Sequence, residues 1–221
     1  MKPRTLLASA LTLGLGLALP LAGTAAPAMP AMQAAPQAAA APAAPKLHAA
    51  LRGLWHGHVV HTRAYAMAVK AGNKAAAAKA ADDVVANAKQ IANAVAGFYG
   101  ADAGKGMLKL LAGHWAGVKA LTDAEHAGDK AASDKAMQDL SANAGEIAKF
   151  LAGANPANWP EATVRGLLLE HVADHHAQLG EIMSGDTAAE AKTWAGMQEH
   201  MNMIADALAG GIARQFPAKV Q

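Results

Sequence analysis

The stretch Leu51–His58, LRGLWHGH, recurs twice in altered form, as MLKLLAGH at Met107–His114 and as VRGLLLEH at Val164–His171. Each copy has apolar residues at its first, fourth and fifth positions and histidine at its eighth, and the copies follow one another after 56 and 57 residues. Self-similarity at a fixed period is typical of a repeated structural unit. We therefore predict three copies of one unit.

Each unit has the pattern of two antiparallel helices joined by a tight turn. In the first unit, apolar residues such as Leu51, Leu54 and Trp55 have the three-and-four spacing of an amphipathic helix. Glycine suits a left-handed helix C-terminus, and Asn or Asp caps the helix that follows. The offsets that align the units also align three such turn pairs, Gly72-Asn73, Gly128-Asp129 and Gly185-Asp186.

The sequence thus predicts an all-α fold, a six-helix bundle built from three repeated helical hairpins. The hairpins cover about residues 47–100, 103–155 and 160–217, and Pro156 and Pro160 break the chain before the third hairpin. Residues 46–217 are expected to form one domain.

Antiparallel geometry indicates which side chains of a hairpin meet. Counting outward from each turn places His58 opposite Asn87, His114 opposite Asn143 and His171 opposite His200. If the hairpins close around an axis, the three repeated histidines converge on one central site. If the hairpins stack as an open array, the histidines lie apart. The sequence alone leaves both arrangements open.

The third hairpin contains the most distinctive candidate metal site. His171 and His175 are four residues apart, so both imidazoles lie on one helical face, and His200 approaches from the partner helix. Neutral imidazole nitrogens in such a group suit copper or zinc. Glu170 and Asp174 are placed to act as further ligands or as hydrogen-bond acceptors for the ligands.

Histidines of the other hairpins extend this set. His58 and His61 are three residues apart and share a helical face, and His114 repeats His58. The candidate metal ligands are therefore His171, His175, His200, His58, His114 and His61.

Two other interpretations stay open. The repeated histidines could form structural hydrogen bonds, His58 with Asn87 and His114 with Asn143, in a module that binds a small ligand or a protein partner without catalysis. The second interpretation is that His171 and His200 bind a haem iron. The signatures HEXXH, GxSxG, GxGxxG and the P-loop are absent, so the sequence does not indicate an enzyme.

The N-terminal residues predict export. Lys2 and Arg4 precede an apolar run at residues 6–21, followed by small residues, which is the order of a signal peptide over residues 1–26. Residues 27–45 are rich in Ala and Pro and are expected to form an extended, disordered spacer. We expect a periplasmic or secreted protein with no membrane span after signal removal.

Charge and cysteine content exclude several classes of partner and site. Without residues 1–26, the 19 basic side chains fall to 17 and balance the 17 acidic ones. A neutral chain without a basic run does not indicate nucleic-acid binding. The chain has no cysteine, which excludes disulfides and thiolate metal sites.

The stretches LRGLWHGHVVHTR at residues 51–63, FYGADAGK at 98–105 and EHV at 170–172 resemble an uncharacterised group of bacterial exported all-helical proteins with an LRxLWxxHVxxTR-like opening. The resemblance covers nearly all of residues 50–217. It implies an exported helical fold and no activity. In that group an acidic residue commonly precedes the repeated histidine, a position at which Glu170 fits and Gly57 and Gly113 depart.

The leading hypothesis from the sequence is an exported helical bundle that binds a transition metal through histidines. Copper or zinc is the expected ion. Storage, buffering or sensing is the expected role, rather than catalysis.

Overall fold

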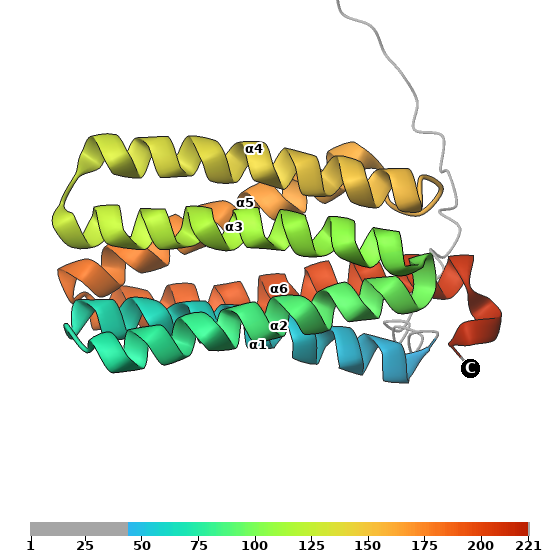
Figure 1. Cartoon of the computed structure of the whole chain (residues 1–221), viewed down its shortest axis with the longest axis horizontal. Helices are drawn as coiled ribbons and strands as arrows, with labels where there is room; N and C mark the ends of the chain where they lie inside the picture. The colour runs from blue at the N-terminus through green and yellow to red at the C-terminus, as the bar shows by residue number, and fades with distance from the viewer. Residues whose placement is uncertain (1–43, 221) are drawn as a thin grey trace, which may run out of the picture. The chain divides into compact units, whose positions relative to one another are not determined.

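The computed structural model describes residues 44–220, which fold into six α-helices and one short 3₁₀-helix (Figure 1). The elements are α1 Pro45–Lys70, α2 Lys74–Tyr99, α3 Ala101–Ala127, α4 Lys130–Ala154, α5 Glu161–Ser184, α6 Thr187–Gln215 and η1 Pro217–Lys219. The prediction of an all-helical bundle is confirmed. The predicted signal peptide, and the predicted spacer up to residue 43, lie outside the described residues.

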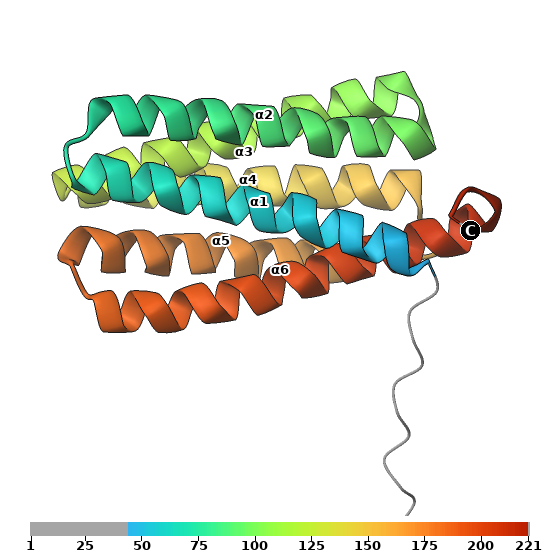
Figure 2. The ribbon, with the colours of Figure 1, turned by 90° about the horizontal axis from the view of Figure 1, so that it is seen from below.

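The six helices form a closed ring. Each helix packs against the next along the chain, and α1 also packs against α6 (Figures 1 and 2). The odd-numbered helices α1, α3 and α5 additionally touch one another, which places them toward the inside of the ring. The helices are therefore closed around an axis and do not form an open array.

Three tight turns at one end of the bundle join α1 to α2, α3 to α4 and α5 to α6 (Figure 1). Each turn has a glycine with positive φ and an Asn or Asp whose side chain accepts a 3.0 Å hydrogen bond from the backbone N–H three residues later. The glycines are Gly72, Gly128 and Gly185, and the capping residues are Asn73, Asp129 and Asp186. The predicted turn chemistry is confirmed.

Apolar side chains from all six helices fill the ring. Val59, Leu121 and Leu140 are completely buried, and Ile91, Ile147 and Ile204, which the sequence offsets align, are each 3 % exposed. Removal of this apolar surface from water is the main force that holds the helices together. The inner faces of α1, α3 and α5 therefore offer a dry environment to any polar side chain placed on them.

Ion pairs reinforce the contact between α1 and α6 that closes the ring. Asp206 of α6 accepts hydrogen bonds from His48 Nδ1 at 2.8 Å and from Arg52 Nε at 2.9 Å. Nearer the turns, Arg63 of α1 donates to Glu190 of α6 at 2.6 and 2.8 Å. The first and last helices are thus joined at two levels.

At the end of the bundle away from the three tight turns, a tryptophan packs against α6. Trp159, in the link between α4 and α5, is 3 % exposed, and its indole N–H donates to the backbone carbonyl of Ala207 at 3.1 Å. A Cβ added at Gly211 would overlap the indole ring. We expect Gly211→Ala to lower the free energy of unfolding by about 1–3 kcal/mol, measured by urea denaturation, because the ring has to leave its position.

The neighbouring Gly210 is the matched control. A Cβ at Gly210 would meet only the end of the Arg214 side chain, at 3.4 Å. Because alanine is the better helix former, Gly210→Ala is expected to raise the free energy of unfolding by up to about 1 kcal/mol. Equal losses in both variants would show that the Trp159 contact is not the cause.

Candidate metal centre

Four buried histidines meet inside the bundle between α1, α3 and α5. His58 comes from α1, His114 from α3, and His171 and His175 both come from α5. The ring centroids of His58, His114 and His171 lie 5.6 Å from one another, so each inner helix contributes one corner of an equilateral triangle. One nitrogen of each of the four imidazoles lies within 4.8 Å of the other three.

His175 breaks the three-fold arrangement. Its ring centroid lies 4.4 Å from that of His171, 5.8 Å from that of His58 and 5.9 Å from that of His114. It follows His171 by one helical turn, and the corresponding positions after His58 and His114 are Thr62 and Val118. Only α5 therefore supplies a second imidazole to the cluster.

The cluster is buried with few hydrogen-bond partners. The four residues are between 1 % and 5 % exposed. Both ring nitrogens of His114, both of His171 and Nε2 of His175 have no hydrogen-bond partner among the described residues. A buried polar group without a partner costs about 1–3 kcal/mol, and such groups are rare in folded proteins. Five unpaired nitrogens in one place make this cluster the candidate for a functional site.

Burial keeps the cluster neutral. Removal from water lowers the pKa of His58 to about 3 and that of His114 to about 4. Burial, together with the neighbouring imidazoles, holds the pKa values of His171 and His175 well below their usual range. The neutral imidazole is the form that binds a metal ion. The four side chains are thus already in the ligand form at neutral pH.

Polar side chains from the outer helices bind the backbone of the inner helices next to the cluster. Asn87 Nδ2 donates to the Leu54 carbonyl at 2.9 Å, Asn143 Nδ2 to the Leu110 carbonyl at 3.1 Å, and His200 Nε2 to the Leu167 carbonyl at 2.8 Å. Each accepting carbonyl belongs to the residue four positions before a cluster histidine. The three contacts are therefore equivalent.

These contacts replace the predicted hydrogen bond between His58 and Asn87, because Asn87 donates to the Leu54 carbonyl and its Oδ1 atom has no partner. In the second pair, a polar contact with Asn143 partly offsets the lowering of the His114 pKa by burial, but no hydrogen bond of normal length and angle joins the two side chains. The physical reason is Gly113, whose Cβ, if present, would lie 3.2 Å from Asn143 Nδ2. The missing side chain lets the amide reach the helix backbone, and Gly57 does the same for Asn87, at 2.9 Å.

The structure places the other two predicted ligands outside the group of four. His200 lies close enough to His171 to lower its pKa, but its Nε2 atom is engaged by the Leu167 carbonyl. His61 is partly exposed and lies on the side of α1 that faces Asp83 of α2. The structure thus brings together His58, His114, His171 and His175, but not His61 and His200.

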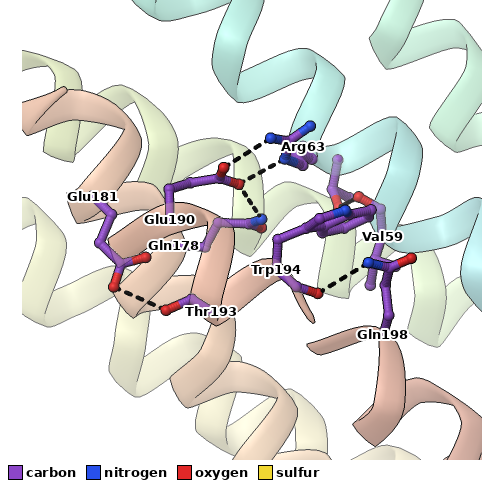
Figure 3. A network of polar contacts seen from close by, with 9 residues as sticks. Val59, Arg63, Gln178, Glu181, Glu190, Thr193, Trp194 and Gln198 are labelled. Carbon is purple, nitrogen blue, oxygen red and sulfur yellow. Dashed lines mark hydrogen bonds and ion pairs between the residues drawn. The ribbon is translucent and has the colours of Figure 1, made fainter. Parts of the chain in front are cut away.

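A polar network joins α1 and α5, two of the three helices that carry cluster histidines, through α6 (Figure 3). The Glu190 carboxylate of α6 accepts hydrogen bonds from Arg63 of α1 and, at 2.9 Å, from Gln178 of α5. The Arg63 guanidinium carbon lies 5.0 Å from the centroid of the Trp194 ring. Since α1 and α5 supply three of the four cluster histidines, the network limits their separation.

Sequence analysis did not identify this network, although one signal was present. Gln178 follows His171 by seven residues and His175 by three, which places its amide on the same buried face of α5. A polar residue on such a face needs a partner. The partner, Glu190, lies in the first turn of α6 and is 7 % exposed.

Comparisons of the chain with protein-family models, with curated proteins and with solved structures found no match. The four histidines are thus the basis for a functional proposal. Within residues 44–220, no helix has both the length and the apolar composition that crossing a bilayer requires.

Replacement of a cluster histidine by leucine is expected to stabilise the metal-free protein. His114→Leu exchanges two unpaired nitrogens for an apolar side chain of similar volume, which should raise the free energy of unfolding by about 1–2 kcal/mol in urea at pH 7. The exposed His126 provides a control, because His126→Leu should change stability by less than about 0.5 kcal/mol. A loss of stability in His114→Leu would contradict the absence of a partner.

Acid is expected to destabilise the metal-free protein before its carboxylates titrate. Between pH 6.5 and 4, His58 and His114 bind protons in the unfolded chain but stay neutral in the folded cluster. The stability contribution is therefore complete above pH 6.5 and falls as the pH is lowered, by about 1.4 kcal/mol per pH unit for each histidine. Urea denaturation at pH 7, 6 and 5 measures the slope. If the free energy of unfolding of His114→Leu depended on pH as steeply as that of the natural protein, the buried histidines would not be the cause.

Proposed function

We propose that the protein binds one transition-metal ion between His58, His114, His171 and His175. The supporting observation is that four neutral imidazoles from three helices, with unpaired nitrogens, lie within 4.8 Å of one another in a dry core. Zn–N bonds of about 2.0–2.1 Å put the nitrogens of a tetrahedral site about 3.3 Å apart. Binding would draw the rings inward and give each bound nitrogen a partner.

Copper and zinc fit this ligand set best. Imidazole nitrogen suits both ions, whereas calcium and magnesium need oxygen ligands, and the group contains no carboxylate. The group also contains no charge that would balance a dication. Because an uncompensated buried charge is costly, monovalent copper would be easier to bury than divalent zinc.

Storage, buffering or sensing of the ion fits the site better than catalysis does. Four protein ligands complete a tetrahedral shell, whereas catalytic zinc sites keep one position for water or substrate. No observation in residues 44–220 favours haem binding, because Nε2 of His200 is engaged by the Leu167 carbonyl.

We further propose that the bundle is a repeat of three hairpins and that the protein is exported to the periplasm or secreted. The equal spacing of His58, His114 and His171, and the equivalent contacts to Leu54, Leu110 and Leu167, support the repeat. The charged and apolar order of residues 1–26 supports export.

Metal titration tests the proposal. After dialysis against a chelator, the protein is expected to bind one equivalent of Co(II), with the visible absorption of a tetrahedral site, and one equivalent of Zn(II) by calorimetry. His171→Leu should weaken binding by more than the roughly 10–100-fold that loss of a supporting contact costs. His126→Leu, at an exposed histidine, should leave binding unchanged. Binding no tighter than that of an exposed histidine tag, or no loss in His171→Leu, would contradict the proposal.

A further inference from the structure

His200 has one nitrogen that the fold does not use. Its Nε2 atom faces the Leu167 carbonyl at 2.8 Å, and because a carbonyl only accepts hydrogen bonds, Nε2 carries the proton. Its Nδ1 atom is buried without a hydrogen-bond partner and lies 3.6 Å from Oε2 of Glu170. The His200 side chain is 3 % exposed, so this nitrogen is held in place and directed at the carboxylate.

The two facing atoms are both acceptors. With the proton on Nε2, the lone pair of His200 Nδ1 points toward a carboxylate oxygen that also carries lone pairs. Two acceptors at this separation repel each other unless a proton or a metal ion lies between them. An imidazole nitrogen and a carboxylate oxygen together are also a common ligand pair for zinc and copper.

The chain itself shows that the backbone contact does not require this pair. At the two equivalent places, Asn87 and Asn143 make the same bond to an inner-helix carbonyl, and glycine occupies the position of Glu170. Both differences, His for Asn and Glu for Gly, occur together and only beside the helix that carries two cluster histidines. A Cβ at position 170 favours the longer imidazole over asparagine, but the backbone contact requires neither Nδ1 of His200 nor the carboxylate of Glu170.

The pair also connects solvent to the cluster. The Glu170 side chain is 62 % exposed, His200 is buried, and His171, the next residue after Glu170, belongs to the cluster. Asp174, one turn along α5, is half-buried. Potential ligand groups thus extend from the exposed Glu170 through the buried His200 to the cluster at His171.

We propose that Glu170 and His200 form a second cation site, a capture site that takes a copper or zinc ion from solvent and passes it to His171. This inference rests on the proposed metal binding by the four-histidine cluster. The capture site binds the ion more weakly than the cluster because it offers two ligands in place of four.

Stopped-flow loading of the metal-free full-length protein with Co(II) tests the capture site. The double variant Glu170→Gly, His200→Asn is the sharpest, because it reproduces the glycine and asparagine that make the backbone contact at the two equivalent places and lacks both proposed ligand atoms. Glu170→Gln removes the carboxylate charge. Each variant is expected to load about tenfold more slowly than the natural protein, with the same final absorption and one equivalent bound. Glu199→Gln removes an exposed charge next to His200 and should load at the natural rate.

The outcomes separate the two proposals. If the natural protein takes up no Co(II), the proposed function fails and the capture site fails with it. If the natural protein loads and both variants load at the natural rate, only the capture site is overturned. If the double variant loses the final absorption while Glu170→Gln keeps it, His200 is a ligand of the buried centre and the capture site is likewise overturned. Thermal denaturation of each variant shows whether the fold is retained.

Discussion

Four neutral imidazoles share a dry volume in which their nitrogens have almost no hydrogen-bond partners, and the rest of the bundle holds them there. Several unpaired nitrogens together oppose folding by an amount comparable to much of the stability of a small protein. The apolar ring around them, closed between α1 and α6, compensates for this cost. The unpaired nitrogens have a physical explanation if they bind a metal ion, because they do not contribute to the stability of the metal-free fold.

Local features of the fold could be predicted from the sequence because each depends on a few neighbouring residues. Gly72 and Asn73 decide a turn through a positive φ and a side-chain cap, and neither depends on distant residues. Closure of the ring is different. It depends on contacts such as Arg63 with Glu190, which are far apart in the chain and have no common spacing. The sequence therefore left the closed and open arrangements undecided.

The candidate site was likewise predictable where it depends on residues close together in the chain, and not where it depends on long-range contacts. The spacing of His171 and His175 places both rings on one face of a helix, and the repeat adds His58 and His114 once the ring is known to close. The position of His200 was harder to predict, because it depends on which ring nitrogen meets the backbone. Its alignment with Asn87 and Asn143 was the available signal, since those amides bind inner-helix carbonyls in the same way. His61 is turned toward α2 by the helical rotation of three residues.

The single departure from three-fold order at the centre has a chemical meaning. His58, His114 and His171 alone form a triangle whose fourth direction would be open, which is how metalloenzymes leave room for a reactant. Position 175 closes that direction with a fourth imidazole, where α3 has Val118. For the proposed metal site, a single side chain at position 175 therefore decides between a complete ligand shell and one with an open coordination position.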